Sequence, residues 1–372
     1  MSNQPETEIE LWEAVTGRLS KAVPWDWTFE SPRPRGSRWA GAVTDPRVDA
    51  WLEFQVRGGR TRLAVELRLR FEPRDVEGLA ELANSVEAAG RPPDRVAEAK
   101  HRLDGWLLAA PFLSRRSQEL LVKADWSYID ATGNIRIVLD RPPVFVQLQG
   151  AAKNPFHEPR PLRTLKGPIA GRLVRALADL RPPYGVLDLA DRAGTSAAMA
   201  SRVVALLAAE AIVMRERRGG IKAVDWKALL ERWTEEYSFV RSNRIVRYLA
   251  LRGRKPLLER LRRTQRQYAI TGAMVAERRR TVAPAIVTAI YSPEPEALAR
   301  ECELEQATRV ADVLIAEPFD AVVFERAWEE EGLSYVALTQ AVADLFTSGD
   351  RNPQIGAALI EWMEANPDGW GA

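Results

Sequence analysis

Hydrophobic and polar residues in the first 150 positions follow two different periods. Apolar residues recur at helical spacing from Leu11 to Leu19, which predicts an amphipathic helix that ends near Ala22. Beyond Trp39 apolar and polar residues alternate, as they do in strands that bury one face. Alternation predicts strands over residues 48–56 and 60–71, followed by a helix over residues 76–86. Residues 105–114 are expected to form a buried strand that leads into a helix with Leu120, Leu121 and Val122, and residues 126–150 are expected to form strands around a turn at Gly133-Asn134.

The middle of the chain, from Pro168 to Val224, has the pattern of three short helices and a hairpin. The first helix is amphipathic and must stop at Pro182, because proline cannot continue a helix. The second helix is closed by Gly194, which we expect in the left-handed conformation. Thr195 or Ser196 can then cap the third helix.

The third helix of this stretch divides into a slim side and a bulky side. Ala198, Ser201 and Ala205 share the slim side, and Arg202 lies at its edge. Apolar and charged residues alternate around Gly219-Gly220 just beyond the helix, which indicates a hairpin. The opposite, bulky side of the helix carries Met199, Val203, Leu206, Leu207 and Glu210.

The last third of the chain has an α/β pattern. An amphipathic helix over residues 226–233 precedes a run of basic residues that extends from Arg241 to Arg266. This run either extends a nucleic-acid contact or forms a solvated face that the acidic stretch from Glu294 to Glu305 balances. Two amphipathic helices near residues 338–346 and 355–363 are expected to close the core. Four acids of this region are expected to cap helices or form salt bridges: Glu317, Asp320, Asp344 and Asp350.

Composition narrows the classes of protein that fit. The chain has 372 residues, a formal net charge of +2 and 46% hydrophobic residues, so any nucleic-acid contact must be local. The single Cys302 excludes an internal disulfide, and the two histidines, His101 and His157, are far apart. We therefore expect no resident metal ion or cofactor. Since no signal peptide or membrane span is evident, we also expect a cytoplasmic protein.

Acidic and basic residues on the first two strands resemble the core of the PD-(D/E)XK nucleases. An aspartate, a hairpin, and then Glu-X-basic on the next strand occur here as Asp49, Glu66 and Arg68. Glu66 and Arg68 share a face because side chains alternate along a strand. The resemblance implies that the two acids bind magnesium and that a lysine assists the attacking water. Arginine takes the place of that lysine here, and it stays protonated near any working pH, whereas the pKa of a buried lysine can be lowered. We expect a nuclease-like fold without activity; the alternatives are a magnesium-dependent DNA endonuclease and a plain ion pair on a sheet.

The three helices and hairpin in the middle of the chain resemble the winged helix-turn-helix of IclR-like regulators. That resemblance implies that the third helix reads the DNA major groove and that the hairpin, the wing, contacts phosphates. The alternative is a winged helix that serves only protein contacts. The residues that the resemblance places at double-stranded DNA are Ser196, Met199, Ser201, Arg202, Arg215, Arg217, Arg218 and Lys222.

Short phrases in the last third resemble AbiEi-type regulators, the antitoxins of type IV toxin–antitoxin systems. The phrases are residues 268–276, "LIAEPFD" and "VALTQAVADLFTSGDR". The resemblance implies a regulator that binds its own promoter and has a cognate toxin as partner. A second copy of this chain, in a homodimer, is the other candidate partner. Unlike those antitoxins, this chain has a nuclease-like domain ahead of the winged helix.

Taken together, these patterns predict a multidomain α/β protein that acts as a DNA-binding transcriptional regulator. A mixed sheet comes first, a winged helix-turn-helix lies in the centre, and an α/β domain comes last. Arg160, Arg163 and Lys166 of the linker either follow phosphates or are ordinary solvated charges. The predicted domains and linker are residues 1–152, a Pro-rich linker 153–167, 168–240 and 241–372.

Overall fold

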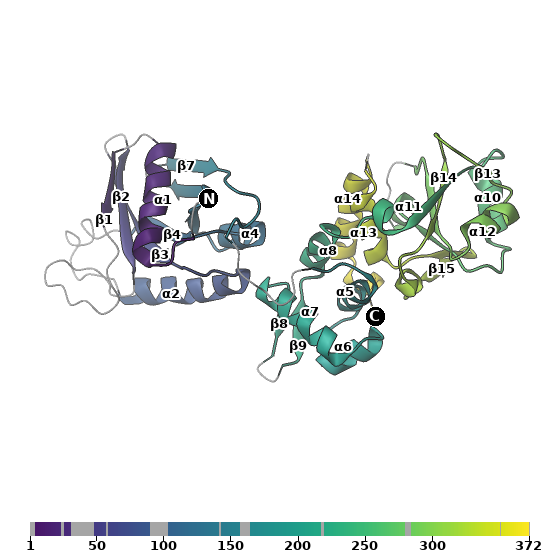
Figure 1. Ribbon diagram of the computed structural model, residues 1–372, viewed down its shortest axis with the longest axis horizontal. Coiled ribbons are helices and arrows are strands. Elements are labelled where there is room, and N and C mark those ends of the chain that lie inside the picture. The colour runs from purple at the N-terminus through teal and green to yellow at the C-terminus, as the bar shows by residue number, and fades with distance from the viewer. Residues whose placement is uncertain are drawn as a thin grey trace. The chain divides into compact units, whose positions relative to one another are not determined.

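The computed structural model divides the chain into two compact units, Met1–Arg160 and Pro161–Ala372 (Figure 1). Both units are mixed α/β, and each contains a seven-stranded sheet. Each unit is considered by itself below. The residues that the structure describes are 4–23, 26–30, 48–56, 59–89, 103–140, 143–156, 164–216, 219–279, 284–349 and 351–371.

The first unit is built on a sheet whose strands follow the order of the chain, from β1 to β7. Strands β3, β4 and β5 run parallel to one another, and the remaining neighbours are antiparallel. Its strands are β1 Asp26–Glu30, β2 Ala50–Val56, β3 Gly59–Leu67, β4 Gly105–Ala110, β5 Ser127–Asp130, β6 Ile135–Asp140 and β7 Pro143–Leu148. Its helices are α1 Glu8–Ala22, η1 Pro73–Asp75, α2 Val76–Ala89 and α4 Arg115–Lys123.

The alternation along β2 and β3 builds a separate core on each face of this sheet. Leu52 and Leu63 lie in the core that α1 covers, while Trp51 and Ala64 lie in the core that α2 and α4 cover. A strand presents successive side chains to opposite faces, and the alternation predicts that one face is buried. In the structure both faces are buried, and Glu53, Thr61 and Glu66 are buried along with the apolar residues. The expected helices and the strands β2 to β7 are found, but β3 ends at Leu67 and not near residue 71, and β1 is a strand that the pattern does not predict.

A buried carboxylate fixes the turn between β5 and β6. Asp130 is fully buried, and its side chain accepts hydrogen bonds from the backbone of Leu113, Thr132 and Asn134. The Thr132 hydroxyl and the Asn134 side-chain amide donate to it as well, at 2.7 and 2.8 Å. Burying a charge is tolerated when its oxygens receive this many donors. Asp130 therefore has a structural role.

The second unit begins with the helix–hairpin segment, our name for residues 164–224 (Figure 1, teal). Tyr184, between its first two helices, exchanges two backbone hydrogen bonds with Ile221 of the hairpin. This segment contains α5 Pro168–Asp179, α6 Val186–Arg192, α7 Ala197–Ala209, β8 Val213–Arg215 and β9 Ile221–Val224. Its elements match the three helices and the hairpin that the sequence predicts.

The rest of the second unit is a mixed sheet with helices packed around it. The strand order is β13-β10-β14-β12-β11-β16-β15. The strands are β10 Arg244–Leu249, β11 Ala269–Thr271, β12 Thr288–Tyr291, β13 Glu305–Gln306, β14 Val313–Glu317, β15 Trp328–Glu330 and β16 Leu333–Tyr335. The helices are α8 Trp226–Thr234, α9 Phe239–Ser242, α10 Arg254–Leu261, α11 Ala273–Arg279, α12 Pro295–Glu301, η2 Ala321–Phe324, α13 Leu338–Thr347, α14 Asn352–Ala365 and η3 Pro367–Gly369.

One hydrophobic core runs through the whole second unit. It extends along the sequence from Leu165 to Met363 and includes Leu173 of α5, Leu230 of α8 and Val342 of α13. The sequence predicts separate domains on either side of residue 240, but the structure joins these two stretches in one compact unit. Among the described helices, none is both long and apolar enough to cross a membrane.

Candidate nucleic-acid interface

Local sequence signals place α7 at the surface of the second unit. Gly194 has φ +57°, as expected for the residue that ends α6. The Ser196 hydroxyl then caps α7 by accepting a hydrogen bond from the Met199 backbone N–H at 3.3 Å. Ala200, Val203, Val204 and Leu207 are buried and hold the helix to the core.

The opposite side of α7 is exposed and slim. Ser196, Ser201, Arg202 and Ala205 are all exposed on this side, as the sequence predicts. The Arg202 Nε donates to the Ala198 carbonyl oxygen at 3.3 Å. Small side chains allow a helix to approach a groove closely, and Arg202 leaves a guanidinium at the edge of that approach.

Met199 differs from its neighbours among the residues expected at DNA. It is half-buried and packs against the hydrophobic core of the second unit. Its contribution to α7 is therefore to anchor the helix.

The hairpin formed by β8 and β9 carries basic side chains beside α7. Arg215 and Lys222 are exposed, while Val213 and Ile221 are buried beneath them. An Arg215 terminal nitrogen donates to the Gly219 carbonyl oxygen at 3.3 Å, across the turn. Two other residues expected at DNA, Arg217 and Arg218, lie outside the described residues.

Ion pairing separates the cations of the helix–hairpin segment from the basic run that follows it. Among the described residues, Arg202, Arg215 and Lys222 form no ion pair, and the same holds for Arg192 at the end of α6. Sequence reasoning did not single out Arg192, since it reads as an ordinary last-turn residue. Most arginines between 244 and 266 do pair with glutamates: Arg244, Arg252, Arg254, Arg260, Arg262 and Arg266.

These pairs support the second interpretation of the basic run, a solvated face that acidic residues balance. Arg244 contacts Glu296 and Glu317 at 2.8 and 2.6 Å, and Arg266 contacts Glu294 and Glu301 at 2.8 and 2.9 Å. To contact phosphate, these arginines would first have to break their ion pairs with glutamates. The structure favours a surface balanced by acidic residues.

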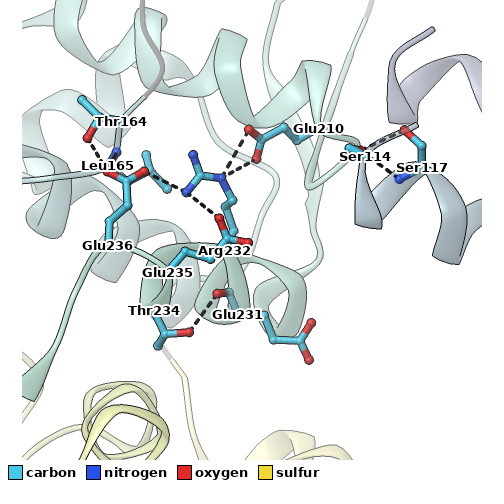
Figure 2. A network of polar contacts seen from close by, with 10 residues as sticks. All are labelled: Ser114, Ser117, Thr164, Leu165, Glu210, Glu231, Arg232, Thr234, Glu235 and Glu236. Carbon is cyan, nitrogen blue, oxygen red and sulfur yellow. Dashed lines mark hydrogen bonds and ion pairs between the residues drawn. The ribbon is translucent and has the colours of Figure 1, made fainter. Parts of the chain in front are cut away.

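Arg232 of α8 ties the end of α7 to the rest of the unit (Figure 2). Its guanidinium contacts Glu210 at 3.1 Å and Glu236 at 2.9 Å. Glu236 in turn accepts hydrogen bonds from the Thr164 hydroxyl and from the Leu165 N–H. Burial raises the pKa of Glu210, and the charge of Arg232 opposes that rise. Arg232 thus joins α7, α8 and the residues before α5.

A fully buried arginine joins α5 to the helices that follow the sheet. Arg175 donates to Asp179 Oδ2 at 2.9 Å and to the Gln340 side-chain oxygen at 2.8 Å. It also donates to the carbonyl oxygens of Val322 and Glu325. The helix–hairpin segment is therefore connected to α13 by polar contacts as well as by packing.

From Gln340 the buried network continues to Asp344. The Gln340 amide donates to Asp344 Oδ1 at 2.9 Å, and three hydroxyls donate to the same carboxylate: those of Tyr237, Tyr291 and Thr271. Burial raises the pKa of Asp344 to about 6, against these hydrogen bonds.

The sequence-based expectation for the four acids is correct for two of them. Glu317 forms a salt bridge with Arg244, and Asp320 caps η2 and pairs with Arg172. For Asp344 it is wrong, because this carboxylate is buried among hydroxyls and an amide. The fourth acid, Asp350, lies outside the described residues.

The nuclease-like constellation lies in the first unit. Glu66 in β3 is buried, and Arg68, just beyond the strand, contacts its Oε1 at 2.5 Å. Asp49, just before β2, accepts a hydrogen bond from the Leu67 N–H at 3.0 Å. A guanidinium thus occupies the place next to Glu66 where a metal ion would have to bind. Within the described ranges, no three His, Cys, Asp or Glu side chains are grouped to hold a metal.

Comparison with protein-family models, curated proteins and solved structures found no match to this chain. The phrases that resemble AbiEi-type regulators fall on β11 with α11, on β14 and on α13.

Proposed function

We propose that this protein binds double-stranded DNA through the helix–hairpin segment and acts as a transcriptional regulator. The order of three helices and a two-stranded hairpin is that of a winged helix-turn-helix. In this proposal α7 enters the major groove with its slim side, and the hairpin contacts phosphates. A homodimer, a cognate toxin and a cytoplasmic location stay predictions of the sequence.

The unpaired cations on α7 and the hairpin carry this proposal. Arg202, Arg215 and Lys222 are exposed, and among the described residues none of them has an acidic partner. A side chain that already holds a carboxylate must lose that contact before it can bind phosphate, and these three need not. A winged helix used only for protein contacts would not need such cations.

A salt titration of DNA binding tests the proposal. We would measure the affinity for a labelled duplex of mixed sequence by fluorescence anisotropy at increasing salt. Each neutralised phosphate contributes about −0.9 to the slope of log K against log salt. Replacing both Arg215 and Lys222 by Gln should therefore reduce the slope by about 1.8. Failure to bind at low salt would overturn the proposal.

A matched control separates this interface from the basic run. Arg263→Gln also removes one exposed cation, but from the end of α10. It should leave the slope unchanged. If it reduces the slope by about 0.9 while the Arg215 and Lys222 double variant does not change it, the DNA contact lies in the basic run and not on the hairpin.

For the first unit we propose a nuclease-like fold that has lost metal-dependent catalysis. Asp49, the β2–β3 hairpin, Glu66 and α2 follow in the order that the resemblance requires. Asp49 and Glu66 would be the acids of a magnesium site. Because Arg68 holds Glu66 and the Leu67 N–H holds Asp49, these residues do not fit a metal ion.

A further inference from the structure

A pocket of about 230 Å³ lies in the second unit, where the end of α5 meets β15 and the last described residues of the chain. We infer that this pocket binds a small planar carboxylate, of the size and shape of benzoate. The lining residues that matter for this inference are Asp179, Arg279, Arg326, Trp328, Leu338 and Trp370.

The acid in the pocket is already satisfied. Asp179 is buried and accepts hydrogen bonds from Arg175 at 2.9 Å, from Arg326 at 2.6 Å and from the Thr339 hydroxyl. Its negative charge therefore faces two guanidinium groups of the protein. It has little capacity left to attract a cationic ligand.

The two arginines of the pocket keep donors to spare. Arg326 uses only its Nε, so its terminal nitrogens have no acceptor among the described residues. The Arg279 Nε is buried with no hydrogen-bond partner in the described part of the chain, and an Arg279 terminal nitrogen lies 4.0 Å from Glu330 Oε2. A buried N–H donor without an acceptor is costly unless a bound anion accepts from it. A carboxylate matches the fork of an arginine better than a single-atom anion does.

Two tryptophans, Trp328 and Trp370, line the pocket, and contacts with neighbouring residues hold both of them. The Arg279 guanidinium lies 3.8 Å from the centre of the Trp328 ring, which stacks on Tyr335 at 4.6 Å. The Trp328 indole N–H donates to the Val336 carbonyl oxygen at 3.0 Å. On the other side, the Trp370 indole N–H donates to the Met363 carbonyl oxygen at 2.8 Å. Both indoles are thus fixed before a ligand arrives.

The shape and charge together select the ligand class. Two rings and Leu338 offer apolar surface for a flat body, and two arginines offer donors for one carboxylate. The volume is below the usual 300–1,000 Å³ of pockets for drug-sized ligands, so the ligand must be small. The inference does not depend on DNA binding, since none of the lining residues belongs to α7 or to the hairpin.

Benzoate is the probe for the test, with benzamide as its uncharged match. In the full-length protein, the indole N–H resonances of Trp328 and Trp370 can be assigned from Trp328→Phe and Trp370→Phe. Both resonances should shift saturably with benzoate and not with benzamide. Arg279→Gln should weaken benzoate binding about tenfold or more, the effect of losing hydrogen bonds to a charged donor.

Two further variants test whether the loss of benzoate binding is specific to the Arg279 guanidinium. Arg279→Lys keeps the charge and should retain part of the affinity, while Arg300→Gln, on the exposed side of α12, should retain all of it. Unchanged positions of the other indole resonances show that each variant is folded. The inference is overturned if no saturable shift occurs up to about 10 mM benzoate, if benzamide binds equally well, or if Arg279→Gln binds as wild type does.

Discussion

Replacing Asp344 by asparagine should remove a specific part of the pH dependence of folding. Asp344 is completely buried, and no arginine or lysine is among its hydrogen-bond partners, which are Thr271, Tyr237, Tyr291 and Gln340. Burial raises its pKa from 3.8 to about 6. The folded protein therefore binds a proton at Asp344 more tightly than the unfolded chain does.

The sign and size of the pH effect on the free energy of unfolding follow from this difference in pKa. Because the pKa of Asp344 is raised on folding, its contribution to the free energy of unfolding is highest below pH 3.8. That contribution falls as the pH rises towards 6 and is constant above pH 6. Each pKa unit corresponds to about 1.4 kcal/mol, so the fall is about 3 kcal/mol. Asp344→Asn cannot ionise and should lack this fall.

Denaturant unfolding at a series of pH values measures the effect. We would follow circular dichroism of the full chain between about pH 4 and pH 7 and analyse the transition that the substitution shifts. Other carboxylates titrate in the same range, so the quantity to compare is the difference between wild type and Asp344→Asn. That difference should change by about 2.4 kcal/mol between pH 4 and pH 7, since pH 4 lies just above the pKa of the unfolded chain. A change below about 1 kcal/mol would refute the argument, because it would mean that Asp344 ionises in the fold as easily as in water.

Four further outcomes are expected. Arg202→Ala should change which duplexes are selected from a random pool while leaving non-specific affinity nearly intact; an unchanged selection would place Arg202 away from the bases. Arg68→Ala should lower the unfolding free energy of the first unit by about 2 kcal/mol, because Glu66 loses its cation, and calorimetry would measure this. Neither wild type nor Arg68→Lys should nick supercoiled DNA with magnesium, and nicking by wild type would contradict the proposed loss of catalysis. Arg232→Gln should weaken DNA binding although we do not expect Arg232 to contact DNA, because Glu210 at the end of α7 loses its ion pair with Arg232. Anisotropy curves equal to those of the wild type would count against this.

Periodicity alone predicted the strands β2 and β3 and the exposed side of α7. The alternation in β2 and β3 predicted one buried face, but the structure has a core on each face, because helices also cover the side that carries Trp51 and Ala64. The two sides of α7 were equally clear, since small and bulky residues separate at helical spacing. In both cases neighbours in the sequence supply the whole signal.

The sequence could not show contacts between distant positions. Strand β10 was read as part of a basic run, because Arg244 and Arg247 frame its apolar residues. The partners of Arg244, Glu296 and Glu317, lie 52 and 73 positions further along the chain. The burial of Asp344 was missed for the same reason, since its hydroxyl partners come from β11, from β12 and from the segment between α8 and α9. No local pattern records such pairings.

The continuous core from Leu165 to Met363 has a consequence for how this protein could arise and be engineered. A recombination joint at residue 240 would cut through shared packing and leave two fragments with exposed apolar surface. A joint near residue 160 would leave the core of each compact unit whole. Chimeras that exchange the first unit should therefore be tolerated, whereas a transplanted helix–hairpin segment must take the sheet and its helices with it.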